Sequence, residues 1–430
     1  MTTRRSHIAH ALLSGLTLLM LTVACERKDL YLRVDQTQID IAVYDIRLEL
    51  LWGMSWHTEW QYEWDEELYG PIGYTMPHYV RASIYDVDSL HDYSRTNCYT
   101  RNFPASGGRV SLNAGAWYDM LFYNTGTEYI LFDQSSDYAY YHASTRTSDY
   151  VPVISRGEHD TPQGTEPFDY VSYKQPDELF GTFLEQLLVS EDPTDYDKIT
   201  DEETGEIVYV YNINAQMNPY SFIYMLQVMV VNNVDSVGPI ISVKRALAPG
   251  DTVRCASSGM TLTGVAKGVD LFTRQTFSEA ASITVDEGDI RYMKPKDDLT
   301  LPDGTHTHGD IFAARVLTWG LPGIDPLWEW EQMRDSADTR SSSSSRMPTL
   351  THRNKLGVRF WLRNGYSHVE VFDVTDQLRS HPAGGIITVV MDAREKISDE
   401  ELEQKDPDKG GGFDASVGDW GNEMDADITI

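Results

Sequence analysis

The chain has 430 residues, of which 41% are hydrophobic, and it carries 66 Asp and Glu against 35 Lys and Arg. The resulting net charge of −31 argues against a nucleic-acid-binding protein, because such proteins gain affinity by neutralising phosphates with Lys and Arg. It also argues against attachment to a membrane through a basic surface patch. The length predicts two or three domains, and two fit best.

The first 24 residues have the pattern of a secretory signal. Arg4 and Arg5 precede an apolar run, residues 11–24, which is too short to span a bilayer, since a spanning helix needs roughly 20 residues. The segment Leu21-Thr22-Val23-Ala24-Cys25 resembles a bacterial lipobox, although Thr22 stands where Leu is usual. We therefore predict a signal peptide over residues 1–24 and lipid modification of Cys25. Plain secretion, with Cys25 an incidental thiol, is the alternative.

A lipid at Cys25 predicts the location of the protein. Several acyl chains on one cysteine anchor a protein stably, whereas a single chain holds only marginally. Glu26 and Asp29, directly after the cysteine, resemble the surface-export signal of Bacteroidetes lipoproteins. We expect a lipid anchor in the outer membrane and exposure at the cell surface.

Residues 30–133 alternate strand patterns with turn signals. Residues 39–43 alternate apolar and polar positions and predict a half-buried strand, and residues 78–86 predict another. Residues 117–123 and 128–133 flank the turn sequence Asn124-Thr125-Gly126-Thr127. Because Asn and Gly accept turn geometry at little steric cost, these two runs predict a β-hairpin.

Four tryptophans recur at every fourth position in the segment after the first strand. The row has two interpretations: a hydrophobic face under a sheet, which we favour because large aromatic side chains dominate core energetics, or a platform on which a glycan stacks. The four residues are Trp52, Trp56, Trp60 and Trp64.

The middle of the chain predicts one helix between two loops. Residues 134–170 are polar and predict a long surface loop. After Pro176, apolar residues at positions 179, 180, 183, 184, 187 and 188 predict a helix. Residues 190–206 are acidic and predict an exposed loop at a domain boundary, without the spacing of an EF-hand calcium loop. We expect domains over residues 25–190 and 191–430.

The second half of the chain predicts an all-β sandwich, because short strands recur about every ten residues between Gly, Asn and Pro. A hairpin is expected about Asn364-Gly365, followed by a short helical turn at residues 375–380 and a strand at 384–392. Residues 334–348 predict a flexible loop. The remaining predicted strands are 207–216, 220–231, 241–248, 258–273 and 308–323.

The chain carries no catalytic signature. It lacks the GxSxG, HExxH, P-loop and GxGxxG patterns, so we predict no catalytic residue, no cofactor and no enzyme. His306 and His308 lie on one strand face, but Asp303-Gly304 before them favours a polar turn over a metal site. For Cys98 and Cys255 we favour two unpaired buried thiols over a disulfide.

Several segments resemble fimbrillin-like lipoproteins of Bacteroidales, especially the fimbrial anchor and accessory group and an uncharacterised Bacteroides family of this architecture. The resemblance covers nearly the whole mature chain. It implies two transthyretin-like β-sandwiches and a part in a type V pilus as a structural or adhesive subunit. It also implies partner subunits bound by β-strand addition, in which main-chain hydrogen bonds give affinity. The segments are NTGTEYILFDQ, PYSFIYMLQVMVVNN, SGMTLTGVAKGVDL, VEVFDVTDQLRSHPAGGIITVVMD and GGGFDASVGDWGNEMDADITI.

The last of these segments leaves two alternatives open. Ile428 and Ile430 alternate with Thr429, which is typical of a strand. Such a strand either is exchanged with another subunit or completes its own sandwich, and we favour completion. A glycan-binding surface lipoprotein using the tryptophan row is the alternative to the fimbrial function.

Overall fold

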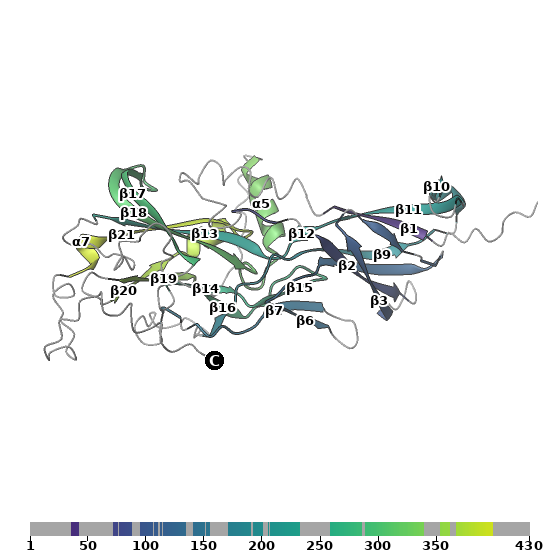
Figure 1. Ribbon diagram of the computed structural model, residues 1–430, viewed down its shortest axis with the longest axis horizontal. Helices are drawn as coiled ribbons and strands as arrows, with labels where there is room; N and C mark the ends of the chain where they lie inside the picture. Colours follow the sequence, from purple (N-terminus) through teal and green to yellow (C-terminus); the bar gives the residue numbers. More distant parts are fainter. Residues whose placement is uncertain are drawn as a thin grey trace, which may run out of the picture. The chain divides into compact units, whose positions relative to one another are not determined.

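The fold is known from a computed structural model, which divides the chain into two compact units (Figure 1). Unit 1 combines residues 1–42, 79–122 and 184–215, and unit 2 combines residues 43–78, 123–183 and 216–430. The predicted domains 25–190 and 191–430 are continuous, whereas these units interleave, and the division at residue 190 stays a prediction. The structure describes residues 36–42, 72–75, 77–87, 95–105, 107–110, 112–113, 115–134, 141–150, 152–154, 171–190, 192–200, 205, 207–232, 259–285, 289–338, 353–361 and 367–398.

Unit 1 contains a four-stranded sheet in the order β10-β11-β1-β4 and most of a five-stranded sheet in the order β12-β9-β5-β2-β3. Strands β2 and β5 consist mainly of apolar and aromatic residues with few polar ones between them. Most residues of both strands are buried. The strands are β1 (Gln36–Ala42), β2 (Tyr79–Val87), β3 (Arg95–Pro104), β4 (Gly108–Val110), β5 (Trp117–Asn124), β9 (Phe180–Leu188), β10 (Asp197–Thr200), β11 (Ile207–Gln216) and β12 (Asn218–Pro219).

Unit 2 contains a four-stranded sheet in the order β17-β18-β13-β21, a five-stranded sheet in the order β20-β19-β14-β16-β8 and a three-stranded sheet in the order β15-β7-β6. The strands are β6 (Ile130–Gln134), β7 (Tyr141–Thr145), β8 (Ser172–Tyr173), β13 (Phe222–Val231), β14 (Met260–Ala266), β15 (Gly268–Asp270), β16 (Ala280–Val285), β17 (Arg291–Thr300), β18 (His306–Thr318), β19 (Lys355–Trp361), β20 (Ser367–Asp373) and β21 (Gly385–Asp392).

Strand β13 forms the centre of unit 2. All ten of its residues are buried, as expected for a strand whose run of apolar residues is covered on both faces. It pairs antiparallel with β18 on one side and parallel with β21 on the other. Gln227, its one amide side chain, accepts a hydrogen bond from the Thr388 hydroxyl of β21 at 2.9 Å. The strand therefore positions both neighbours of the sheet.

The helical segments among the described residues are η1 (Pro193–Asp195), α5 (Pro326–Asp338), α6 (Thr375–Ser380) and α7 (Ala393–Lys396). Helix α6 connects β20 to β21, and its Leu378 is fully buried. Helix α7 follows β21 directly, and Asp392 caps it by accepting a hydrogen bond from the Arg394 N–H at 3.0 Å. No helix within the described ranges is long and apolar enough to cross a bilayer.

The predicted all-β fold is confirmed. The hairpin about Asn364-Gly365 is confirmed by the antiparallel pairing of β19 with β20, and the helical turn at residues 375–380 is α6. The strand expected at 241–248 lies outside the described residues. The half-buried character expected of residues 39–43 stays a prediction, although the structure has β1 there.

Several local predictions are wrong. The loops predicted at residues 134–170 and 190–206 contain strands β7 and β10, and helix α5 extends into the loop predicted at residues 334–348. The predicted helix after Pro176 is strand β9, because its backbone pairs with β5 and β12 and tertiary pairing overrides an ambiguous apolar spacing. The predicted hairpin of residues 117–133 does not form, although β5 and β6 exist as strands. Strand β5 lies between β9 and β2, whereas β6 pairs with β7.

A β-bulge at Gly264 gives a first test. Gly264 has φ +75° where the register of β14 and β16 shifts, and a Cβ there would lie 2.8 Å from the Arg353 carbonyl oxygen and from Asn354 Nδ2. We expect Gly264→Ala to lower the free energy of unfolding by about 2–4 kcal/mol through backbone strain and the clash together.

Gly304 supplies the matched control, since it has φ +82° with no atom within 4 Å of the added Cβ. Gly304→Ala therefore carries backbone strain alone, about 1 kcal/mol. Urea unfolding of both variants measures the difference. Equal losses of unfolding free energy in the two variants would show that Arg353 and Asn354 move away from the added methyl group at no energetic cost.

Candidate functional site

Most of the residues for which the sequence predicts a functional role lie outside the described part of the chain. Cys25, the four tryptophans Trp52, Trp56, Trp60 and Trp64, and Cys255 are among them. Cys98 is half-buried on β3. The lipidation of Cys25, the aromatic platform and the state of the two cysteines therefore stay predictions.

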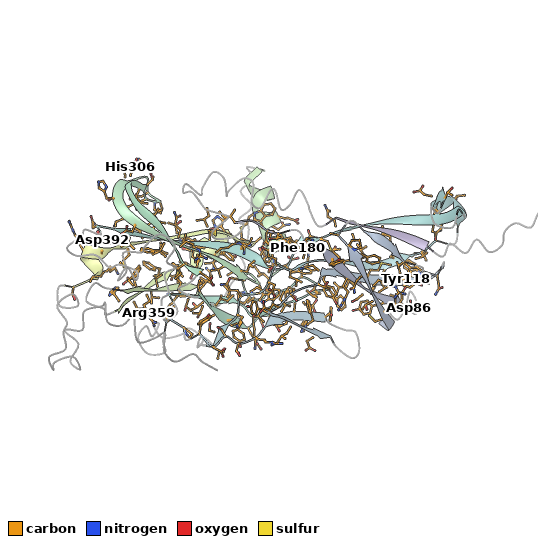
Figure 2. All side chains as sticks on the ribbon, in the orientation of Figure 1. Asp86, Tyr118, Phe180, His306, Arg359 and Asp392 are labelled. Atoms are coloured by element: carbon orange, nitrogen blue, oxygen red, sulfur yellow. The ribbon has the colours of Figure 1, made fainter. Side chains whose placement is uncertain are left out.

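The histidine pair is placed at the exposed end of the β17–β18 hairpin (Figure 2). His306 Nδ1 lies 2.7 Å from Asp298 Oδ1, and both side chains are largely exposed. Asp303 accepts the Thr305 N–H at 2.9 Å and so forms the polar turn that the sequence favours. Within the described ranges no group of three or more His, Cys, Asp or Glu side chains is arranged to hold a metal ion.

Arg315 binds three groups in unit 2. Its Nη2 donates to Glu178 Oε1 at 2.6 Å and to the Gly73 carbonyl at 3.0 Å, and its Nε donates to the Ile72 carbonyl at 3.2 Å. Glu178 Oε2 in turn accepts the Thr75 N–H at 2.7 Å. Arg315 and Glu178 are 20% and 18% exposed, so the pair is largely removed from water and each charge depends on these partners.

The backbone on either side of Glu178 is held by two polar side chains. Asn124 donates from Nδ2 to the Glu178 carbonyl at 2.8 Å and accepts the Phe180 N–H at Oδ1 at 2.6 Å. Ser221 accepts the Leu179 N–H at 2.9 Å. These bonds explain why Asn124 does not form the predicted turn, since both ends of its amide are committed to the segment that begins β9.

Tyr74 closes the same cluster from the other side. Its hydroxyl donates to the Ser221 carbonyl at 2.8 Å, and its ring meets Phe180 edge-on with centroids 5.3 Å apart. Burial raises the pKa of the Tyr74 hydroxyl above its ordinary value, so it stays protonated and remains a donor. An aromatic pair of this geometry contributes about 0.5–1.5 kcal/mol beyond its buried area.

We call this cluster the junction. Its members come from residues 72–75, 124, 178–180, 221 and 315, all of which belong to unit 2. The chain passes between the units at residues 42/43, 78/79, 122/123, 183/184 and 215/216, and a junction segment lies within a few residues of each of the last four crossings. The junction therefore holds together, inside unit 2, the segments that lead to unit 1.

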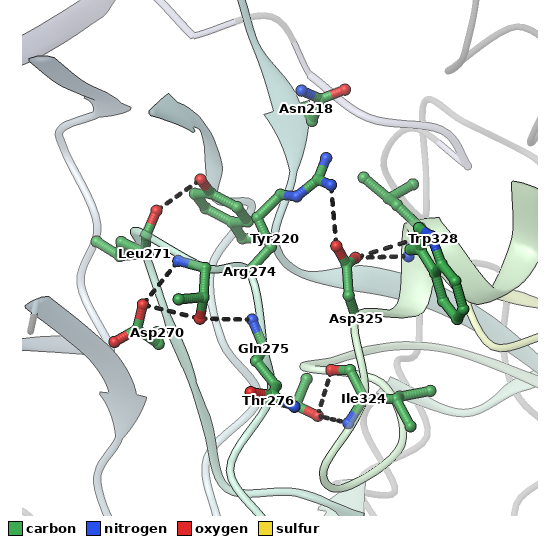
Figure 3. Close-up of polar contacts among 12 residues, drawn as sticks. Asn218, Tyr220, Asp270, Leu271, Arg274, Gln275, Thr276, Ile324, Asp325 and Trp328 are labelled. Atoms are coloured by element: carbon green, nitrogen blue, oxygen red, sulfur yellow. Dashed lines mark hydrogen bonds and ion pairs between the residues drawn. The ribbon is translucent and has the colours of Figure 1, made fainter. Parts of the chain in front are cut away.

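A second polar cluster fixes the start of α5 (Figure 3). Asp325 Oδ1 accepts the N–H groups of Leu327 and Trp328 at 3.1 and 3.3 Å, and Oδ2 lies 2.9 Å from Arg274 Nη2. Burial raises the pKa of the Asp325 carboxyl, and the charge of Arg274 opposes that rise. Because every oxygen of Asp325 is engaged, the cluster serves as a helix cap.

Among the described strands, β20 and β21 each end their sheet; α6 lies between them in the sequence, and α7 follows β21. Gln377 of α6 donates from Nε2 to the Thr388 carbonyl and accepts the Thr388 N–H, each at 2.8 Å. The Gln377 side-chain amide thus makes with Thr388 the two hydrogen bonds that a residue of a neighbouring strand would make. Lys396 of α7 lies 2.7 Å from Glu370 of β20, so α7 is bound to the edge of the five-stranded sheet.

Comparison with known families matches residues 69–265 to a family described as a domain of unknown function, DUF5119. The match covers less than half of the chain. A comparison with curated proteins finds no match.

Several solved structures are similar to the chain. A candidate adhesin from Bacteroides ovatus has 14% identity and a TM-score of 0.45 and covers 88% of this chain and 97% of its own. The fimbrial anchor protein Mfa2 from Porphyromonas gingivalis has 10% identity and a TM-score of 0.32 and covers 83% and 90%. A candidate cell adhesion protein from Bacteroides fragilis has 8% identity and a TM-score of 0.30 and covers 83% and 93%.

These proteins belong to the group that the sequence resembles, so the predicted resemblance is confirmed. At such identities and TM-scores the similarity by itself assigns neither the fold nor the function of this chain.

The junction gives a second test. We expect Arg315→Met to lower the free energy of unfolding by about 2–4 kcal/mol, because it leaves Glu178 largely buried without its cation. Chemical unfolding followed by tryptophan fluorescence measures the change.

Lys267→Met is the matched control. Lys267 lies 3.5 Å from Glu279, whose side chain is 71% exposed, and exposed pairs of this kind contribute about 0–1 kcal/mol. Similar losses in the two variants would contradict a special role for the junction.

Proposed function

We propose that the protein is a cell-surface lipoprotein that acts as a structural or adhesive fimbrial subunit without catalytic activity. In this proposal each unit is a transthyretin-like β-sandwich, Cys25 carries the lipid, and the outer membrane holds the protein through that lipid. Other pilus subunits bind by adding a strand to an open sheet edge. The pilus is of type V.

The observation that carries the proposal is the junction. A subunit that links a membrane to a pilus experiences tension along its chain, and the chain carries that tension through the five points at which it passes from one unit to the other. The junction binds a segment close to each of four crossings with a largely buried ion pair, two side-chain amide bonds and a buried tyrosine. Such an arrangement suits a protein whose work is to hold two β units together.

Among fimbrial roles, the anchor fits best. A shaft subunit must lose its lipidated leader by proteolysis, and Arg146 is one exposed basic residue at which a protease could cut. The Arg146 carbonyl accepts the Lys174 N–H at 2.9 Å, and the Ser148 N–H donates to the Ser172 carbonyl at 2.7 Å. Proteases cut preferentially at exposed loop tips, whereas the backbone at Arg146 is hydrogen-bonded to a neighbouring segment. Cleavage at Arg146 is therefore unfavourable, and the chain would keep its lipidated N-terminus. Arg156, a second arginine in this polar stretch of the sequence, lies outside the described ranges.

Lipidation is tested by Cys25→Ala. We expect it to abolish labelling with radioactive palmitate and to move the protein from the outer-membrane fraction to the medium or periplasm, because the acidic chain has no other means of attachment. Cys98→Ala serves as the control and should keep both the label and the membrane location. Labelling that persists in Cys25→Ala would overturn the anchoring.

The fimbrial role is tested by the same variant in the source cells. Electron microscopy and shearing should show pili that are released into the medium or altered in length. Pili that stay attached with normal length and number, in cells that lack the protein altogether, would contradict the anchor role while leaving lipidation untouched.

Glycan binding remains the alternative. The observation that favours it is the exposure of aromatic residues, since Trp328 of α5 is 50% exposed, and the row Trp52 to Trp64 adds four more indoles to the sequence. Affinity electrophoresis in gels containing neutral polysaccharides tests it. Replacing the four tryptophans of the row by alanine should abolish retardation if they form the platform, whereas Trp328→Ala alone should not.

A further inference from the structure

A short segment of unit 2 crosses the face of the five-stranded sheet β20-β19-β14-β16-β8. Ser148 lies at the edge of this sheet, where its N–H donates to the Ser172 carbonyl of β8 at 2.7 Å. Five residues later, the Val153 N–H donates to Oγ1 of Thr261 on β14 at 2.9 Å. We call residues 152–154 the strap.

The length of the chain defines the path that leads to the strap. From Ser148 across β8 and β16 to β14 there are three strand spacings, about 14 Å at about 4.8 Å each. The five residue steps from 148 to 153 span at most about 17 Å. The chain therefore passes directly over β16 and runs across the strands, not along them. The strap is not a strand of the ladder.

The strap lies in a slot that one layer of side chains forms. Thr261 is the ladder partner of Thr284 on β16 and of Gly357 on β19, so these three residues face the same side of the sheet. Oγ1 of Thr261 and Oγ1 of Thr284 are 3.1 Å apart. A Cβ on Gly357 would lie 2.4 Å from Ile154 Cγ1. The slot thus consists of two hydroxyl groups and the space above a glycine.

The adjacent layer of the same strands faces the core. Leu262 is the ladder partner of Ile283 and Leu356, and all three are buried in the core. Successive residues of a strand point to opposite faces, so the strap covers the side of the sheet that faces away from the core. Displacement of the strap therefore leaves the core layer and the pairing of the strands in place.

The two sides of this contact respond differently to water. Val153 and Ile154 are 3% and 6% exposed, so apolar burial holds the strap in the slot. The slot offers hydroxyl groups, which form hydrogen bonds with water when the strap leaves. A contact between two apolar layers would expose apolar surface on both sides. Separation here exposes it mainly on the strap, which favours a local opening.

We propose that the strap is a conformational device that opens as a unit, while the five-stranded sheet beneath it stays folded. Opening releases Val153 and Ile154 and uncovers the slot, so one surface of unit 2 changes its chemistry without unfolding. The proposal goes beyond the fimbrial function. It depends neither on a lipid at Cys25 nor on pili, and it can fail while both hold.

Hydrogen exchange of the wild-type protein in increasing, sub-denaturing urea tests the proposal. Mass spectrometry with electron-transfer fragmentation distinguishes the Val153 amide from the amides of β14 and β19. A local opening exposes little new surface, so the exchange rate of Val153 should stay constant as urea rises, whereas the rates of the sheet amides should increase. Without urea, Val153 should exchange at least about tenfold faster than the slowest β14 amides.

Gly357→Ala separates the strap from the sheet. The added methyl group meets the flexible side chain of Ile154, so it should displace the strap and raise the exchange rate of Val153 at least about tenfold. The β14 amides and the urea midpoint should stay unchanged. Thr261→Val, which keeps the shape of the side chain but removes the hydrogen-bond acceptor, should also accelerate the Val153 amide.

Gly309→Ala is the matched control within a ladder. A Cβ there would lie 2.6 Å from the Val230 carbonyl oxygen, which is backbone of the strand that pairs with Gly309. This variant should lower the urea midpoint and accelerate the amides of β13 and β18 together. The far-ultraviolet spectrum shows whether each variant is folded, and the wild-type measurement stands without any of them.

Two results would overturn the proposal. The first is a wild-type Val153 amide that exchanges at the rate of the β14 amides and with the same dependence on urea, since the strap then opens only with the sheet. The second is a folded Gly357→Ala variant whose Val153 amide stays as protected as in the wild-type protein, since the slot then does not hold the strap.

Discussion

The structure depends most on the ion pair between Arg315 and Glu178. Each partner is about one-fifth exposed, and an ion pair so far removed from water is stable only when its remaining hydrogen-bonding groups are satisfied. Here the backbone supplies them, through the carbonyls of Ile72 and Gly73 and the N–H of Thr75. The electrostatic requirement of two side chains thus fixes the path of a segment remote from both in sequence.

In unit 2, several amide side chains make the hydrogen bonds that the backbone of a neighbouring strand would otherwise make. Gln377 makes both bonds of a missing strand residue at Thr388, and Asn124 does the same between Glu178 and Phe180. Asn354 donates to the carbonyls of Thr263 and Gly264 at 3.2 and 2.7 Å, where the β-bulge interrupts the ladder. Each amide satisfies backbone groups that would otherwise be left unpaired at a bulge, a strand start or a sheet edge.

The sequence predicts what is local and fails where partners are distant. The all-β class, the β19–β20 hairpin and α6 follow from periodicity and turn residues within one short stretch. The apolar spacing of residues 179–188 fits a helix as well as a strand, and β5 and β12, which decide the matter, lie far away in the sequence. Helix α5 is not predicted although Asp325-Pro326 is a helix-start signal, because residues 308–323 have the pattern of a strand and residues 334–348 have the composition of a loop.

The same limit applies to the candidate site. Nothing near Arg315 in the sequence marks it, since its partners begin 137 residues away at Glu178. A single charged residue in the middle of an apolar strand, DIFAARVLTW, is the one signal that could have drawn attention to it, because a charge there must be paired or exposed. The polar turn before the histidine pair, by contrast, follows from the sequence, because Asp303 and Thr305 are only two residues apart.

The excess of acidic over basic residues explains where several Lys and Arg side chains lie. With 35 Lys and Arg against 66 Asp and Glu, nearly half of the carboxylates have no Lys or Arg to pair with one to one, and hydration at the surface is the favourable environment for them. Arg315, Arg274 and Lys396 each lie beside an acid whose side chain is less than one-fifth exposed, where an unpaired carboxylate would be most unfavourable. The surplus acids then leave the whole chain strongly negative, and like-charged copies repel one another.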